Sequence, residues 1–134
     1  MEGDGLRINF DSMKPIYAQV AGAIEDDIIL GKLQEGEPVY SQLVLSRELN
    51  INPATAAKGI SLLVQKGVLE RQRGLSMTVA SGAKQRILDE KREKEFSEIV
   101  GTLVDQAKKT GLSEDQVIAK IRAIFAAASK ERAV

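Results

Sequence analysis

Residues 41–80 constrain the fold of this chain more than any other segment, because two short helical patterns, a turn and two β-leaning runs follow one another there. Asn52 and Pro53 mark the start of the second helix, since asparagine caps free N–H groups and proline at the first helical position loses no hydrogen bond. The β-leaning residues 68–71 and 77–79 flank a glycine-containing loop of hairpin length. This order predicts a winged helix-turn-helix, a mainly α fold with a small β-hairpin.

Two further helices are expected before residue 53. The first begins at Pro15, ends at Gly31 and repeats apolar residues every four positions, at Ile16, Val20, Ile24 and Ile28. After a connecting turn over residues 32–40, a short helix capped by Ser41 is expected to bury Val44, Leu45 and Leu49. The helix over residues 53–66 is expected to bury Ala56, Ile60, Leu63 and Val64.

Beyond residue 82 the pattern predicts a helical hairpin. A long helix over residues 83–109 ends before Gly111, and Ser113 and Gln116 form a capping box for a last helix that gives way to a polar tail at residues 129–134. The two helices carry more apolar surface than each can hide in the other, so we expect a homodimer interface. Its predicted residues are Phe96, Val100, Leu103, Val104, Ile121, Ile124 and Phe125. The alternative is that the hairpin packs on the winged-helix core of its own chain.

These patterns divide the chain into three expected parts. Residues 1–13 read as a flexible arm, residues 14–80 as a winged helix-turn-helix DNA-binding domain, and residues 81–134 as a helical dimerisation tail.

Cysteine and histidine are both absent from the sequence. Their absence excludes disulfides, thiolate and imidazole chemistry and the usual zinc ligands, and therefore a zinc finger. The acidic residues 25–27 read as a solvated helix face, because adjacent helix positions point in different directions. We expect no enzyme activity, no catalytic residue, no metal site and no cofactor.

No stretch of the sequence approaches the ~18 apolar residues of a membrane-spanning helix. The first residues also lack the basic and apolar regions of a secretion signal. The simplest expectation is a cytoplasmic protein without a membrane partner.

The formal net charge of the chain is zero, but the charges are unevenly distributed. Residues 1–40 have a balance of −5, residues 41–80 of +3, and residues 81–134 of +2. The positive surplus therefore includes the segment with the helix-turn-helix pattern, which is where contact with phosphates would require it.

Three residues of the second helix of this motif are candidates for DNA contact. Asn52, Thr55 and Lys58 are spaced by three and can point out of the protein together, toward bases and phosphates in the major groove. Capping of the helix would by itself explain Asn52, and solvation of the helix surface would explain Lys58. Each residue alone therefore has a purely structural explanation.

Four more candidates lie outside that helix. Ser41 begins the preceding helix, where its hydroxyl and the free N–H groups can take a phosphate, although it too would serve as a cap. Arg71, Arg73 and Gly74 lie at the hairpin tip, where we expect contact with the DNA backbone and minor groove.

From residue 14 to residue 80 the sequence resembles the N-terminal domain of GntR-type bacterial transcription regulators. The matching positions are Pro15-Ile16-Tyr17, Ile28, Gly31, Leu33, Gly36, Ser41, Leu45, Leu49, Ile51-Asn52-Pro53, Thr55, Lys58, Leu62, Gly67-Val68-Leu69-Glu70 and Arg73-Gly74. Most such regulators have a C-terminal effector domain of well over a hundred residues, whereas only residues 81–134 remain here. That short helical tail is similar to the YtrA-type subfamily, in which the tail dimerises.

The sequence departs from the family pattern where basic residues are usual. Leu43 replaces an arginine that is expected to bind a phosphate, and Ala57 occupies a position where a second basic residue is frequent. In the wing, Leu75-Ser76 replace a basic-glycine pair. Because each neutralised phosphate adds about one unit to the salt slope, we expect weaker and less salt-dependent DNA binding than in relatives.

The resemblance implies a homodimeric transcription regulator, in the first place a repressor, that binds double-stranded DNA at a palindromic operator with one recognition helix per half-site. The main alternative is a winged-helix protein-interaction module that has lost DNA binding. A nonspecific architectural protein is disfavoured by the small positive surplus. A small-molecule effector, apolar if it binds the tail, and the lack of any effector both remain open.

Overall fold

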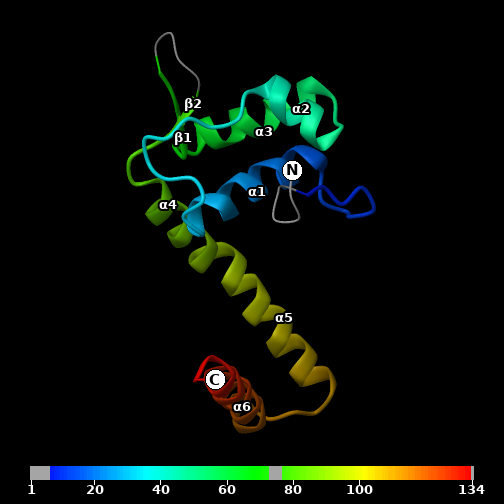
Figure 1. Ribbon diagram of the computed structural model, residues 1–134. Helices are drawn as coiled ribbons and strands as arrows, with labels where there is room; N and C mark the ends of the chain where they lie inside the picture. The colour runs from blue at the N-terminus through cyan, green and yellow to red at the C-terminus, as the bar shows by residue number, and fades with distance from the viewer. Residues whose placement is uncertain (1–6, 73–76, 134) are drawn as a thin grey trace. The chain divides into compact units, whose positions relative to one another are not determined.

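A computed structural model describes residues 7–72 and 77–133 of the chain, with the side chains of residues 132 and 133 left out. By backbone contacts it divides into two compact units, Met1–Glu90 and Lys91–Val134. The chain is mainly helical, with a winged helix-turn-helix in the first unit and further helices in the second, as the sequence predicted (Figure 1). In the described residues, no helix is both long and apolar enough to cross a membrane.

Helix α1, Ile16–Ile29, forms as its apolar spacing predicts. Pro15 precedes the first turn with φ −56° and ψ 147°, and Val20, Ala21, Ile24 and Ile28 are buried. The helix ends before Gly31, whose φ of 81° is a left-handed conformation that glycine adopts without a steric penalty.

The segment before α1 is more ordered than a flexible arm over residues 1–13 would be. The amide N–H of Asn9 donates to Oε1 of Gln19 at 2.8 Å, and Nε2 of Gln19 donates to the carbonyls of Asn9 and Lys14, each at 2.9 Å. One glutamine on α1 therefore holds the backbone from residue 9 to residue 14, a non-local contact that leaves no periodic signal. Residues 1–6 of the predicted arm lie outside the described residues.

Helices α2, Gln42–Leu49, and α3, Pro53–Gln65, form the helix-turn-helix. Asn50 ends α2 in a left-handed conformation, with φ 54° and ψ 51°. The predicted burial of Val44 is wrong, because 41% of this residue is exposed. Helix α2 turns Leu45, Ser46 and Leu49 toward the core instead, and Val44 lies on another side of the helix.

Helix α3 lies directly against α1 at Gly59. A Cβ atom placed on Gly59 would be 2.9 Å from the carbonyl oxygen of Tyr17 and 3.0 Å from Cβ of Val20. Real Cβ atoms essentially never approach another atom to 2.9 Å, so only glycine fits here without a shift of one helix.

The wing consists of β1, Leu69–Arg71, and β2, Met77–Val79, paired antiparallel with Leu69 opposite Val79. A third segment, which the sequence predicted only as a connecting turn, lies along the other edge of β2. Pro38 forms a bridge with Thr78, and the N–H of Val39 donates to the carbonyl of Met77 at 2.8 Å. This pairing joins residues far apart in the chain, so local sequence patterns do not reveal it.

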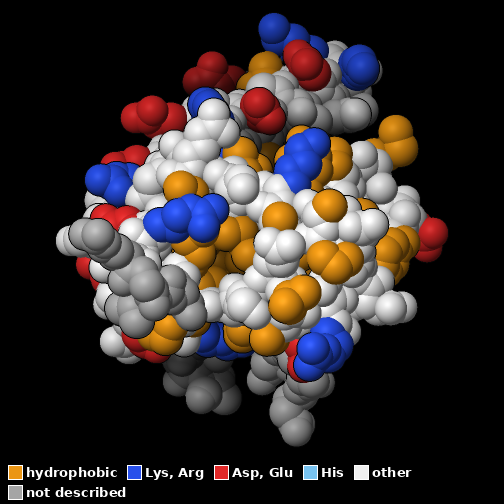
Figure 2. Space-filling model, turned by 90° about the horizontal axis from the view of Figure 1, so that it is seen from above, with side chains coloured by type: hydrophobic (Ala, Val, Ile, Leu, Met, Phe, Trp, Pro, Cys, Tyr) orange, Lys and Arg blue, Asp and Glu red, His pale blue; other side chains and the backbone are white. Residues whose placement is uncertain are grey.

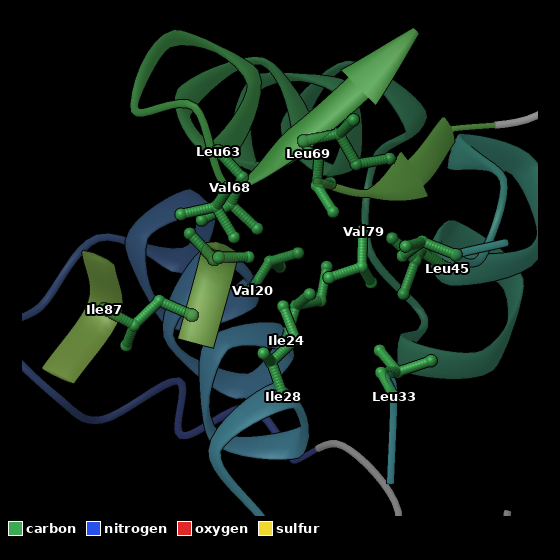
Figure 3. Packing of buried hydrophobic residues seen from close by; sticks show 14 of the residues in the cluster. Val20, Ile24, Ile28, Leu33, Leu45, Leu63, Val68, Leu69, Val79 and Ile87 are labelled. Carbon is green, nitrogen blue, oxygen red and sulfur yellow. The ribbon is translucent and has the colours of Figure 1, made fainter. Parts of the chain in front are cut away.

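The first unit has one hydrophobic core, to which every helix of the unit contributes (Figure 3). The residues labelled there are Val20, Ile24, Ile28, Leu33, Leu45, Leu63, Val68, Leu69, Val79 and Ile87. Helix α4, Ala83–Glu90, was expected to belong to the tail, but its Ala83 and Ile87 are buried in this core. The compact unit therefore extends to Glu90 rather than ending at residue 80.

In the second unit, the π-helix η1, Lys91–Glu95, is followed by α5, Phe96–Lys109, and α6, Glu114–Ala133. The predicted capping box is confirmed: the N–H of Gln116 donates to Oγ of Ser113 at 3.2 Å, and the N–H of Ser113 donates to Oε1 of Gln116 at 2.9 Å. Helix α6 continues through residues 129–133, which were expected to belong to a polar tail.

Replacing Gly59 with alanine is expected to destabilise the protein. Alanine raises helix propensity by up to about 1 kcal/mol, but the added methyl group forces the α1 and α3 backbones apart at a cost of about 1–3 kcal/mol. Gly22 in α1 is the matched control, because its nearest neighbour would be Nζ of Lys14 at an ordinary 3.6 Å. Urea unfolding should show a loss for Gly59→Ala and a gain for Gly22→Ala. Equal gains in both would contradict the close approach.

Candidate nucleic-acid interface

Three elements of the first unit meet around one hollow in its surface. The start of α2, the middle of α3 and the base of the wing contribute its lining residues, which are Tyr40, Ser41, Gln42, Ala57, Ile60, Ser61, Arg71 and Met77. Of the seven predicted DNA-contacting residues, the structure thus brings Ser41 and Arg71 to the same hollow. In Figure 1 the two strands of the wing lie at one end of α3.

Ser41 and Asn52 both cap helices, as their structural explanations required. Oγ of Ser41 accepts a hydrogen bond from the N–H of Val44 at 3.2 Å, and Oδ1 of Asn52 accepts one from the N–H of Ala54 at 2.7 Å. Both residues are also exposed. The side-chain amide nitrogen of Asn52 can therefore still donate to an external acceptor while its oxygen caps α3.

The other two predicted residues on α3 differ in their surroundings. Thr55 is half-buried, whereas Lys58 is exposed. Lys58 leans toward α1, with its ammonium nitrogen 4.0 Å from the centroid of the Tyr17 ring. The side of α3 turned away from the core carries Ala54, Lys58 and Ser61, all exposed, so Thr55 lies nearer the edge of this face than its centre.

Arg71 is exposed at the end of β1. The following residue, Gln72, donates from Nε2 to Oγ1 of Thr78 at 3.3 Å, which links the two strands at the base of the wing. The predicted contacts Arg73 and Gly74 lie outside the described residues, as do Leu75 and Ser76.

At two positions where the family pattern has basic residues, this chain presents apolar side chains at its surface or in the hollow. Leu43 on α2 is 62% exposed, and Ala57 lines the hollow. Seen from above in Figure 2, the described Lys and Arg side chains are scattered among apolar, uncharged and acidic ones and do not form a continuous basic patch.

Sequence reasoning did not select Tyr40, Gln42 or Met77, although they line the hollow. Tyr40 and Gln42 flank Ser41 in the sequence. The prediction of Ser41 as a helix cap and phosphate contact would therefore have been enough to indicate them. Met77 reaches the hollow only through its pairing with Arg71 across the hairpin, and that register depends on the folded wing.

A second candidate site is the exposed apolar surface of α5 and α6, here called the tail surface. It is defined by the seven residues predicted to form a dimer interface: Phe96, Val100, Leu103, Val104, Ile121, Ile124 and Phe125. Each of these side chains is exposed in the single chain, from 39% at Leu103 and Ile121 to 71% at Ile124 and Phe125. Ile99 on α5 is a further exposed apolar residue outside this set. Near the turn between the helices, Ala107 is buried and Leu112 and Val117 are half-buried.

The capping role of Asn52 predicts separable effects of two substitutions. Asn52→Ala removes the acceptor for the N–H of Ala54 and should lower the free energy of unfolding by about 1 kcal/mol. Asn52→Asp keeps an acceptor oxygen and places a negative charge at the helix N-terminus, so stability should be retained. Chemical denaturation measures both variants, and an alanine variant as stable as the original chain would contradict the role of this cap.

Comparison with known proteins identifies relatives of nearly the same length. The sequence model described as bacterial regulatory proteins, gntR family, matches residues 16–79. The uncharacterized HTH-type transcriptional regulator YhcF of Bacillus subtilis (strain 168) is 29% identical over 113 residues, which cover 84% of this chain and 92% of YhcF.

Solved structures of transcription regulators are similar to this chain as well. A GntR-family transcriptional regulator from Bacteroides thetaiotaomicron is 32% identical, with 85% of this chain and 98% of that chain covered and a TM-score of 0.69. YtrA from Sulfolobus acidocaldarius, a GntR-family transcription factor, is 23% identical, with 91% and 97% covered and a TM-score of 0.53. AraR(DBD), solved in complex with operator ORX1, is 28% identical, with 57% and 98% covered and a TM-score of 0.52.

Proposed function

The chain belongs to the GntR family of bacterial regulatory proteins, and from this premise we propose that it is a homodimeric repressor that binds a palindromic operator. The family consists of DNA-binding transcription regulators and not of enzymes, as the sequence predicted. The observation that carries the proposal is the hollow in which the start of α2, the face of α3 and the base of the wing meet. The structural likeness to YtrA extends over 91% of the chain and supports the same order of a winged-helix unit followed by further helices.

In this proposal α3 is the recognition helix and enters the major groove. Asn52, Thr55 and Lys58 meet bases and phosphates there, while Ser41 and Arg71 engage the sugar-phosphate backbone beside it. Arg73 and Gly74, at the tip of the wing, are assigned to the adjacent minor groove on the sequence pattern alone. The operator complex of AraR(DBD), which covers 57% of this chain, supports the use of the winged-helix unit for operator binding.

The tail surface supports the dimer. Burying an apolar side chain is favourable by roughly 1.5–3 kcal/mol when it is fully removed from water. The seven residues of the tail surface, together with Ile99 on α5, are eight large exposed apolar residues on these two helices, more than a monomer usually leaves in contact with solvent. A second copy carries the same surface, and a two-fold dimer would present two recognition helices to the two halves of a palindromic operator.

We infer repression because it is the simplest effect that such a dimer can have on transcription. Bound at a promoter, it excludes RNA polymerase by occupying the DNA and needs no contact with the polymerase. The second candidate, a protein-interaction module that has lost DNA binding, is favoured by one observation: Leu43 presents an exposed apolar side chain where the family usually has an arginine.

Charge-changing substitutions near the hollow are expected to alter the affinity for DNA and its salt dependence. The probe is a duplex selected by the full chain from a random-sequence pool, and affinity is measured by fluorescence polarisation at several salt concentrations. Arg71→Ala should weaken binding and lower the salt slope by about 0.9, whereas Leu43→Arg should strengthen binding and raise the slope by a similar amount.

Lys84→Ala is the matched control, because it removes an exposed lysine from α4, away from the hollow. If Arg71→Ala and Lys84→Ala weaken binding equally, the assigned contact surface is wrong. If no duplex is retained at any salt concentration, the proposal of a repressor fails and the protein-interaction module is favoured instead.

Dimerisation is tested with a charge placed on the tail surface. Leu103→Glu should convert the dimer to monomers in analytical ultracentrifugation, because a carboxylate in an apolar interface is not compensated. The same variant should bind its operator weakly and derepress a reporter gene under that operator. Thr102→Glu places the same charge on the neighbouring residue, which is exposed and outside the tail surface, and should leave the dimer intact. A monomeric original chain would refute the dimer.

A further inference from the structure

Lys58 is held by an aromatic ring of another helix. Its Nζ atom lies 4.0 Å from the centroid of the ring of Tyr17, which belongs to the first turn of α1. This distance is well within the ~6 Å over which an ammonium group is attracted by the electron-rich face of a ring. The side chain of Lys58 is therefore directed to the α1 edge of the recognition helix.

The packing of the two helices explains why this pair meets. Gly59, the next residue after Lys58, is where the backbone of α3 comes so close to the carbonyl oxygen of Tyr17 that a Cβ atom would be 2.9 Å away. The backbone of Tyr17 and that of Lys58 are thus fixed relative to each other by a rigid contact. Only the two side chains have to order for the ammonium to reach the ring.

The ring holds the ammonium without neutralising it. No ion pair links Lys58 to a carboxylate among the residues that the structure describes. A carboxylate partner would compete with a phosphate for the charge, whereas a neutral ring leaves it available. Binding also normally costs the conformational freedom of a long side chain, and prior ordering of that side chain reduces this cost.

We propose that Tyr17 is a positioning residue for DNA binding: its ring holds the ammonium of Lys58 at the α1 edge of α3, where the ammonium meets a DNA phosphate. This inference rests on the proposed function, because it takes Lys58 as a DNA contact. It adds Tyr17, which sequence reasoning did not select for the site, and it assigns Lys58 to the backbone and not to a base.

A double-mutant cycle tests the coupling between the two residues. The full chain and the variants Tyr17→Leu, Tyr17→Phe, Lys58→Ala and Tyr17→Leu/Lys58→Ala are titrated against the duplex selected from the random-sequence pool. Tyr17→Leu should weaken binding about two- to fivefold, and Tyr17→Phe, which keeps the ring, less than about twofold. Lys58→Ala should lower the salt slope by about 0.9, whereas Tyr17→Leu retains all charges and should leave the slope unchanged. The double variant should bind no more weakly than Lys58→Ala alone.

Different failures have different meanings. If Tyr17→Leu weakens binding by the same factor in the Lys58→Ala variant as in the original chain, Tyr17 acts only through the fold and the inference is overturned. If Lys58→Ala binds like the original chain while Arg71→Ala binds weakly, the inference is overturned and the proposed function stands. If the original chain binds no duplex at all, the proposed function fails and the inference with it.

Proton NMR of the free protein checks the geometry independently of DNA. The methylene protons next to the ammonium of Lys58 should be shifted upfield by the ring current in the original chain and in Tyr17→Phe. In Tyr17→Leu they should return to the position of a solvated lysine. Unshifted protons in the original chain would overturn the inference even if the variant proteins differed in affinity.

Discussion

The contact between α1 and α3 at Gly59 is the constraint on which the rest of the first unit depends. A glycine inside a helix costs roughly 0.5–1 kcal/mol relative to alanine, and here it allows two backbones to lie within a distance that no larger residue permits. Because α1 is buried along Val20, Ile24 and Ile28, the close approach fixes α3 on the core. The outer face of α3 is therefore presented by a rigid support and not by a loop.

Polar contacts fix the other end of α3. Nζ of Lys66 lies 3.1 Å from Oε1 of Glu90 and 3.9 Å from Oε2 of Glu25, and a guanidinium nitrogen of Arg86 donates to the carbonyl of Gly67. Lys66 and Glu90 are partly exposed, so solvent screening keeps their attraction modest. Their effect is mainly geometric, because they connect the end of α3 to α4, from which the chain continues into η1 and the tail.

Local rules predicted the helix and strand boundaries well. The asparagine and proline at the start of α3, the glycine after α1 and the capping box of α6 each act within a few residues, so a local sequence pattern is enough to predict them. Predictions of burial were less accurate. Val44 is apolar and periodic but faces solvent, and Ile87 lies in a charged run but is buried, because the neighbouring elements decide which side of a helix is covered.

The sequence by itself determined the winged helix-turn-helix fold, the helical character of the segment that follows it and the residues that cap α2 and α3. These features depend on local hydrogen bonds and on apolar spacing, which the order of residues specifies directly. Only the tertiary structure decided that Ser41 and Arg71 share one hollow, that α4 completes the core and that Lys58 rests on Tyr17. Each of these depends on how closely two distant segments approach, and at Gly59 that distance is set by the absence of a single side chain.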